Sequence, residues 1–378
     1  MPFPVAEYME RLKRLRALMA DRDLGMVIAD EAELLHYFTG FAISENMYRA
    51  VAIPADGEPI MVVRQLDEQP FLKASWFGNR RTFHDLEDPV QVLAEVIKGS
   101  SASTGRIGLD MNSYCMPAMR FRQLFEFLPR ATCVDLSDAF RPMRLIKSAL
   151  EADEIRKAAR IADQALPRAI DATGPGGSTR TAAAAAAAAL LELGSDTGRT
   201  GPITVGRGWN FLHGGVSDDV LEAGDILHLE LVPRVGGYTA KLMRPAVMGE
   251  PSAELGQAAA TLIDLQDRQI AAMVPGAVAA DVDAIMRRGA IDAGLRDDYV
   301  NTTGYTVGYH FEQGPRPSDF TRIFTPEADW PLEAGMTFHM YTSAKTGIAF
   351  SETVLVTDDG PERLTQLERK LFRCGESA

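Results

Sequence analysis

An internal repeat in the C-terminal part of the chain constrains the fold more than any other feature of the sequence. In its first copy, a Gly-Pro-Gly turn at 174–176 precedes a helix-forming stretch at 181–193. In its second copy, a Pro-Gly turn at 275–276 precedes a similar stretch at 281–293. Each stretch is followed by a loop, a glycine-containing strand and a hairpin. The repeat predicts two similar halves that share one curved sheet, with helices outside and a pocket between them.

The two hairpins carry the side chains that most resemble a reactive site. The first hairpin spans 224–244 and the second spans 335–352. Glu230 lies between two leucines in an apolar strand, where a carboxylate is costly unless it is paired or reactive. Because successive strand residues point to opposite faces, His339 and Tyr341 share one face of the second hairpin.

The N-terminal part alternates helix and strand patterns, which is typical of an α/β domain. The expected elements are a helix at 9–19, strands at 25–29, 49–53, 60–63 and 107–110, a helix at 116–127 and a strand at 132–136. A long helix pattern at 151–172 then opens the second half. A chain of 378 residues suits two domains. We expect them at 1–145 and 146–378.

Composition narrows the possible partners and the cellular setting. A net charge of −13 disfavours nucleic acid and anionic membranes as partners. Three widely spaced cysteines argue against a disulfide framework, and no apolar run is long enough to span a bilayer. The N-terminus has the charged, amphipathic pattern of a helix rather than that of a signal peptide. We therefore expect a cytoplasmic protein that binds neither nucleic acid nor membranes.

The repeat, the Pro-Gly helix starts and the paired hairpins together resemble the creatinase, methionine aminopeptidase and prolidase family. That resemblance implies an α/β N-terminal domain and an α+β pita-bread catalytic domain. In the metal-dependent members, two Asp, one His and two Glu hold a pair of metal ions. The matching places in this chain are Glu230, Lys241, Tyr305, Tyr341 and Ser351. Only the carboxylate of Glu230 suits a hard cation, so we expect no metal and no other cofactor.

Within the family, the segments 303–308, 336–340 and 351–353 look like those of ectoine hydrolase. That enzyme opens a cyclic amidine that carries a carboxylate, and a Glu of its first hairpin is thought to attack the amidine carbon. Glu230 matches this Glu. The resemblance implies a metal-independent hydrolase of a non-peptide C–N bond. The segment 309–317 departs from the ectoine hydrolase pattern and leaves the substrate open.

The resemblance also implies roles for other side chains. His213 should point into the pocket, and either His213 or His339 should protonate the departing nitrogen. Lys241 should stabilise the charge of Glu230 or, alternatively, form a simple buried ion pair with it. His228 and His310 are weaker candidates for the surroundings of the site. The expected substrate contacts are Lys241, Tyr305, Tyr341, Arg244, Tyr48, Arg49, Trp209 and Glu352.

Several of these contacts have a plain structural alternative. Tyr305 and Tyr341 could fill the volume of a lost metal site, and strand alternation points Glu352 away from Ser351 and toward a structural ion pair. Tyr48 and Arg49 lie in the N-terminal domain, and creatinase-type homodimers use that region in the partner's pocket. We expect a homodimer of that kind.

Two other functions remain open. A metallo-aminopeptidase or prolidase would need bound metal and the carboxylate and imidazole ligands that hold it. A non-catalytic, peptidase-like binding protein would show no chemistry that depends on Glu230.

Overall fold

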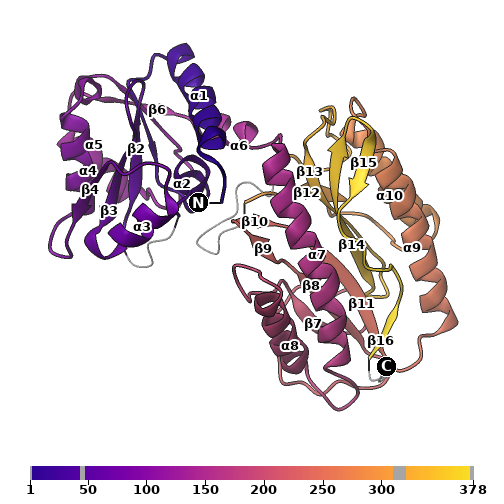
Figure 1. Cartoon of the computed structure of the whole chain (residues 1–378). Coiled ribbons are helices and arrows are strands. Elements are labelled where there is room, and N and C mark those ends of the chain that lie inside the picture. Colours follow the sequence, from indigo (N-terminus) through magenta and orange to yellow (C-terminus); the bar gives the residue numbers. More distant parts are fainter. Residues whose placement is uncertain (1, 43–46, 310–320, 375–378) are drawn as a thin grey trace. The chain divides into compact units, whose positions relative to one another are not determined.

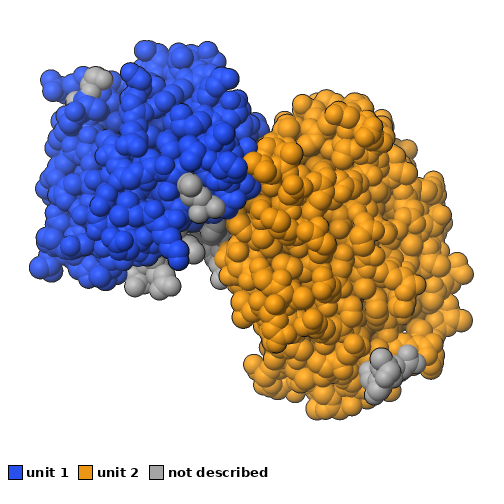
Figure 2. Space-filling view, viewed as in Figure 1, with its two compact units in different colours: residues 1–143, 311–316 blue, residues 144–310, 317–378 orange. Residues whose placement is uncertain are grey.

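The computed structural model describes residues 2–42, 47–309 and 321–374. It divides into two compact units, one that ends at Met143 and one that begins at Arg144 (Figure 2). The division falls close to the boundary expected at 145. Among the described residues, no helix is long and apolar enough to cross a membrane.

The first unit is an α/β layer built on a mixed sheet of six strands in the order β4-β3-β2-β1-β5-β6 (Figure 1). The strands are β1 (Met26–Ala29), β2 (Ala50–Pro54), β3 (Ile60–Arg64), β4 (Arg80–Phe83), β5 (Arg106–Leu109) and β6 (Thr132–Asp135). The helices are α1 (Val5–Asp21), α2 (Ala32–Thr39), α3 (Glu68–Ala74), α4 (Pro89–Lys98), α5 (Ala118–Phe127) and α6 (Ser137–Met143). The elements expected from the sequence are present, but α2, α3, α4, α6 and β4 were not anticipated.

The second unit contains the repeat. Its main sheet has the order β12-β13-β14-β11-β8-β7, so the strands of the two copies mirror each other about its centre. The first copy supplies β7 (Ile203–Gly206), β8 (Ile226–Leu231) and β11 (Leu242–Met248), and the second supplies β12 (Gly304–Thr306), β13 (Thr337–Ser343) and β14 (Ala349–Thr357). The short strands are β9 (Arg234–Val235), β10 (Tyr238–Thr239), β15 (Gly360–Arg363) and β16 (Phe372–Cys374).

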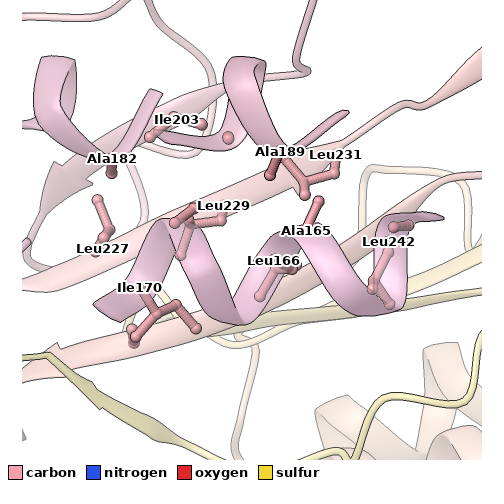
Figure 3. Packing of buried hydrophobic residues seen from close by; sticks show 14 of the residues in the cluster. Ala165, Leu166, Ile170, Ala182, Ala189, Ile203, Leu227, Leu229, Leu231 and Leu242 are labelled. Atoms are coloured by element: carbon pink, nitrogen blue, oxygen red, sulfur yellow. The ribbon is translucent and has the colours of Figure 1, made fainter. Parts of the chain in front are cut away.

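Each copy also supplies two helices, and these cover one face of the sheet (Figure 1). They are α7 (Ala149–Asp171) and α8 (Thr179–Glu192) in the first copy, and α9 (Ala253–Ala271) and α10 (Ala279–Asp292) in the second. A capping box between Ser148 and Glu151 starts α7, which satisfies backbone donors at its first turn. Small alanines of α8 and larger apolar side chains of α7 pack on Leu227, Leu229 and Leu231 of β8 (Figure 3).

The two copies meet at the sheet centre through an unusual seam. Only Met243 and Ser351 are registered as partners between β11 and β14 among the described residues. Side chains supply further hydrogen bonds at the seam. Arg244 Nη1 donates to the carbonyls of Met243 and Ser351 at 2.9 and 2.8 Å. Thr353 Oγ1 accepts from the N–H of Lys241 at 2.8 Å and donates to its carbonyl at 2.9 Å.

Candidate active site

The sheet of the second unit has two chemically different faces. The helix face carries the apolar core, which includes Leu229, Leu242 and Phe338. The opposite face, called the site face below, carries the residues that alternate with these, among them Glu230 and His339. Strand alternation therefore places Glu230 of the first hairpin and His339 and Tyr341 of the second on the side of the sheet away from the helices.

Cross-strand pairing arranges the site face in rows. In the row that contains the candidate nucleophile, Glu230 pairs with Met243, Met243 with Ser351, and Ser351 with Tyr341. The row thus crosses the seam between the two copies of the repeat. Glu230 is 6% exposed.

A second row lies two residues further along the strands, about 7 Å away. Here Lys241 Nζ donates to the hydroxyl of Tyr305 at 3.1 Å, and this hydroxyl is 2.9 Å from Nδ1 of His339. Burial lowers the pKa of His339 well below its usual value, and the positive charge of Lys241 lowers it further. His339 is therefore neutral near pH 7 and offers a hydrogen bond rather than an acidic proton.

A third row lies on the other side of Glu230, where Thr204 pairs with His228. Burial and the nearby charge of His213 lower the pKa of His228 to about 4. His213 is itself exposed, in the loop that leads to β8. A Cβ added to its neighbour Gly214 would lie 3.2 Å from a methyl group of Thr204, so this loop passes over the site face. The structure thus brings His213 and His228 to the same end of the site.

Several buried polar atoms of the site face have no hydrogen-bond partner within the described part of the chain. They are Thr204 Oγ1, His228 Nδ1, Ser351 Oγ and His339 Nε2. Buried polar atoms are costly when unsatisfied, so a group of them on one surface indicates a place that binds polar ligand atoms or water. Thr204 was missed by the sequence analysis, because a threonine in a short strand gives no functional signal on its own.

The side chain of Glu230 is held by close contact with backbone. The Cγ of Glu230 would lie 2.8 Å from a Cβ added to Gly201, so only glycine fits there. The backbone N–H of Glu230 donates to the carbonyl of Pro202 at 2.9 Å. The charge of Glu230 also contributes to the raised pKa of Tyr341, although burial is the larger cause. The carboxylate is therefore within electrostatic reach of the second hairpin.

Aromatic rings line the second hairpin's end of the site. His339 stacks on Tyr341 with ring centroids 5.6 Å apart, and Tyr305 meets Tyr341 edge-on at 5.9 Å. The hydroxyls of Tyr341 and Thr302 are 3.0 Å apart. Trp209, expected as a substrate contact, stacks on the guanidinium of Arg296, whose carbon is 3.8 Å from the ring centroid.

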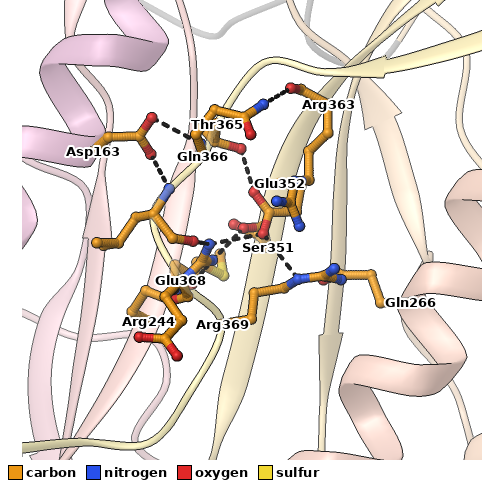
Figure 4. A network of polar contacts seen from close by, with 12 residues as sticks. Asp163, Arg244, Gln266, Ser351, Glu352, Arg363, Thr365, Gln366, Glu368 and Arg369 are labelled. Carbon is orange, nitrogen blue, oxygen red and sulfur yellow. Dashed lines mark hydrogen bonds and ion pairs between the residues drawn. The ribbon is translucent and has the colours of Figure 1, made fainter.

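Arg244 and Glu352 do not lie on the site face, which corrects their expected contact with substrate. Both side chains are 0% exposed, and Arg244 Nη2 donates to Glu352 Oε1 at 2.7 Å on the helix face (Figure 4). Thr365 donates to the other carboxylate oxygen, and Arg369 Nε lies 3.5 Å from Oε1. The ion pair therefore bridges the seam and holds the C-terminal segment against it. This is the structural ion pair that strand alternation predicted for Glu352.

Tyr48 and Arg49 lie in the first unit and are buried there. Tyr48 donates its hydroxyl hydrogen to Asp30 Oδ2 at 3.1 Å, and Arg49 Nε donates to the carbonyl of Ala42 at 3.2 Å. These contacts give both residues a role within their own unit. Their expected reach into a partner's pocket stays a prediction. His310 lies outside the described residues.

The donor set of the site face does not fit a metal pair. Among the residues described, no group of three or more His, Cys, Asp and Glu side chains could hold a metal ion. At the five matching places, Glu230 supplies the one carboxylate, and Lys241 places a cation where a ligand would stand. Hard divalent cations need several oxygen ligands, and an ammonium group repels them.

Comparisons with known proteins define the class. Residues 153–358 match the metallopeptidase family M24, and residues 11–146 match the creatinase/prolidase N-terminal domain. The chain therefore belongs to the M24 metallopeptidase family, a family of hydrolases, and has its two-domain pita-bread architecture. The expected fold is confirmed.

Individual relatives have different activities. The chain is 24% identical to the ectoine hydrolase of Halomonas elongata over 98% of both chains. It is 27% identical to the probable dipeptidase PepE of Mycobacterium tuberculosis over 98% of this chain and 97% of that one. The prolidase structure from Pyrococcus horikoshii superposes with a TM-score of 0.82 at 21% identity, over 96% of this chain and all (100%) of that one. Overall similarity thus leaves the substrate to be argued from the site.

Proposed function

We propose that this chain is a metal-independent hydrolase of a non-peptide C–N bond in a small amidine-like or cyclic carboxylate, with Glu230 as its nucleophile. The proposal depends on which residues stand at the five positions that the family resemblance matches to metal ligands. One carboxylate remains there, accompanied by Lys241, Tyr305, Tyr341 and Ser351. A buried carboxylate beside a buried ammonium suits covalent catalysis better than metal binding.

The neighbours of Glu230 support a nucleophilic role. In the strand register, Glu230 pairs with Met243, so Lys241 is the diagonal neighbour of Glu230 on the adjacent strand. The backbones of Lys241 and Glu230 are therefore about 7 Å apart. Lys241 is 3% exposed, so its positive charge is little screened and stabilises a negative charge at Glu230. The contact with Gly201 restricts the rotamers of Glu230 and holds its carboxylate in place.

The reaction has two steps. A Glu230 oxygen bonds to the amidine carbon, and the bond from that carbon to one nitrogen breaks as this nitrogen takes a proton. Water then adds to the same carbon and releases Glu230 as a carboxylate, which leaves an amide and an amine as product groups. His213 is the better proton donor, because His339 is held neutral and acts as a hydrogen-bond donor or acceptor.

The test is proton NMR of ectoine, hydroxyectoine and creatine with the wild-type protein and with Glu230→Gln. Ring opening of ectoine by the wild type alone would support both the substrate class and the nucleophile. The glutamine variant should remain folded, because the two side chains have nearly the same shape, and a thermal melt measures the stability lost when Lys241 is left without the nearby negative charge. Undiminished turnover by Glu230→Gln would refute the proposed nucleophile.

Peptide-bond hydrolysis is the second candidate, because the PepE relative is as similar as the ectoine hydrolase. It predicts stoichiometric Mn, Zn, Fe or Co in the purified protein and cleavage of Xaa-Pro dipeptides that chelators abolish. Elemental analysis together with a dipeptide assay separates the two candidates. We also propose a homodimer, which sedimentation or light scattering tests.

A further inference from the structure

Arg296 is a buried cation at the edge of the site, and the sequence analysis did not single it out. It follows α10 and is 4% exposed. Its guanidinium lies between two aromatic rings, 3.8 Å from the centroid of Trp209 and 4.5 Å from that of Tyr299. Stacking of this kind fixes the plane of a guanidinium and therefore the directions in which its N–H groups point.

The hydrogen bonds of Arg296 go to neutral acceptors. Nη1 donates to Ser343 Oγ at 3.2 Å, and Nη2 donates to Asn301 Oδ1 at 3.1 Å. No carboxylate forms an ion pair with it in the part of the chain that the structure describes, whereas the comparably buried Arg244 has Glu352. Burial lowers the pKa of Arg296, and the nearby groups of Tyr299 and Asp298 oppose this effect. A buried arginine without a counter-charge is costly, which favours an anion arriving from outside the protein.

The position of Arg296 directs it toward the candidate site. Its partner Ser343 lies on β13, two residues beyond Tyr341, and therefore on the same face of the sheet. Tyr341 and Arg296 also act on each other electrostatically. Along the strands, Ser343 thus lies about one row, or roughly 7 Å, from the row that contains Glu230, and across the sheet β13 lies three strands, or roughly 14 Å, from β8. The Lys241 row lies on the opposite side of Glu230.

We propose that Arg296 is the anion-binding, specificity-determining residue of this site and that it holds the carboxylate of a small substrate whose reacting carbon lies at Glu230. This inference rests on the proposed function, which names Glu230 as the reacting group. The test of the inference measures binding and does not require that Glu230 reacts. Trp209 then has a defined purpose, which is to hold the plane of the guanidinium. The expected contact between substrate and Arg49 is not needed in this arrangement.

A structural role for Arg296 must be separated from anion binding. Its bonds to Ser343 and Asn301 tie β13 to a loop, so its loss could loosen the fold without any ligand being involved. The readout should therefore be the preference for a carboxylate over its carboxamide, measured as a ratio of binding constants within one variant. General loosening lowers both constants together, whereas loss of an anion site lowers only the first.

The experiment is equilibrium calorimetry with ectoine, creatine and alanyl-proline, each compared with its carboxamide. The proteins are wild type, Glu230→Gln, Arg296→Met, Arg296→Lys and the control Arg288→Met, which removes an exposed charge from α10. We expect at least one carboxylate to bind tenfold or more tightly than its carboxamide in the wild type, in Glu230→Gln and in the control. Arg296→Met should reduce that preference to within twofold, and Arg296→Lys should give an intermediate ratio, since lysine lacks the planar fork.

A wild-type protein without preference for any of the three carboxylates overturns the inference, as does an unchanged preference in Arg296→Met. If Arg296→Met does not fold, Arg296→Lys decides: a ratio at least threefold lower supports the inference and an unchanged ratio overturns it. Binding requires no turnover, so the two proposals fail separately. Turnover retained by Glu230→Gln would remove the nucleophile and leave the Arg296 result intact.

Discussion

The ammonium of Lys241 donates a hydrogen bond to the hydroxyl of Tyr305 at 3.1 Å. The family resemblance matches these two residues to two of the places that hold metal ligands in metal-dependent members. Through Tyr305 the bond extends to His339, so a cation of the first repeat copy is linked to an imidazole of the second. A protein-supplied charge and a bridging hydroxyl thus connect the two repeat copies on the site face.

Removing this bridge should impair turnover more than folding. Tyr305→Phe keeps the ring but deprives Lys241 and His339 of their shared partner, and we expect kcat to fall about 10- to 100-fold. Steady-state kinetics on the substrate found by NMR provides the measurement. In a double-mutant cycle with Lys241→Met, the two effects should be strongly non-additive, because both changes break one network. Simple additivity would show that the bridge is not a functional unit.

A methyl group at position 201 should displace the candidate nucleophile. The Cβ of alanine would lie 2.8 Å from Glu230 Cγ and 2.9 Å from its carbonyl oxygen, so Glu230 must move. We expect Gly201→Ala to lower kcat about 100-fold, as small displacements of reacting groups do. Gly256→Ala is the control, because a Cβ at that helical position meets nothing within 4 Å. Equal activity of the two variants would contradict the positioning role of Gly201.

The buried ion pair behind the site should matter for stability. Glu352→Gln leaves the buried guanidinium of Arg244 without its counter-charge, and we expect the free energy of unfolding to drop by about 3–5 kcal/mol. Chemical denaturation followed by circular dichroism measures this change. The exposed pair of Arg180 and Asp218 offers the comparison, and Asp218→Asn should unfold like the wild type. A small effect of Glu352→Gln would show that the seam does not depend on this pair.

Acid should destabilise the fold partly through His228. Its pKa is about 4 in the folded protein against 6.5 for an ordinary histidine, so between these values the unfolded chain binds more protons. Stability from this group is fully present above pH 6.5 and falls by about 3 kcal/mol as the pH approaches 4. His228→Gln should flatten this part of the pH profile of the unfolding free energy. An unchanged profile in His228→Gln would contradict this contribution of His228.

Much of the fold was predictable because the repeat is marked by short sequence patterns. Pro-Gly turns, helix-forming stretches and alternating hairpins depend on near neighbours, and the sequence therefore located α8, α10 and both hairpins. Strand alternation also separated Glu352 from Ser351. Arg296 and Thr204 could not be found in this way, because their importance arises from contacts between distant segments. A single arginine after a helix reads as a surface residue until its burial is known.

The seam between β11 and β14 has a consequence for ligand binding. Its one registered pair, Met243 and Ser351, lies between Glu230 on one repeat copy and Tyr341 on the other. A molecule that touches both outer residues therefore acts as a crosslink between the two copies. Bound substrate should therefore slow amide hydrogen exchange at the seam more than elsewhere in the sheet. Substrate binding at Glu230 would then also tighten the junction between the two repeat copies.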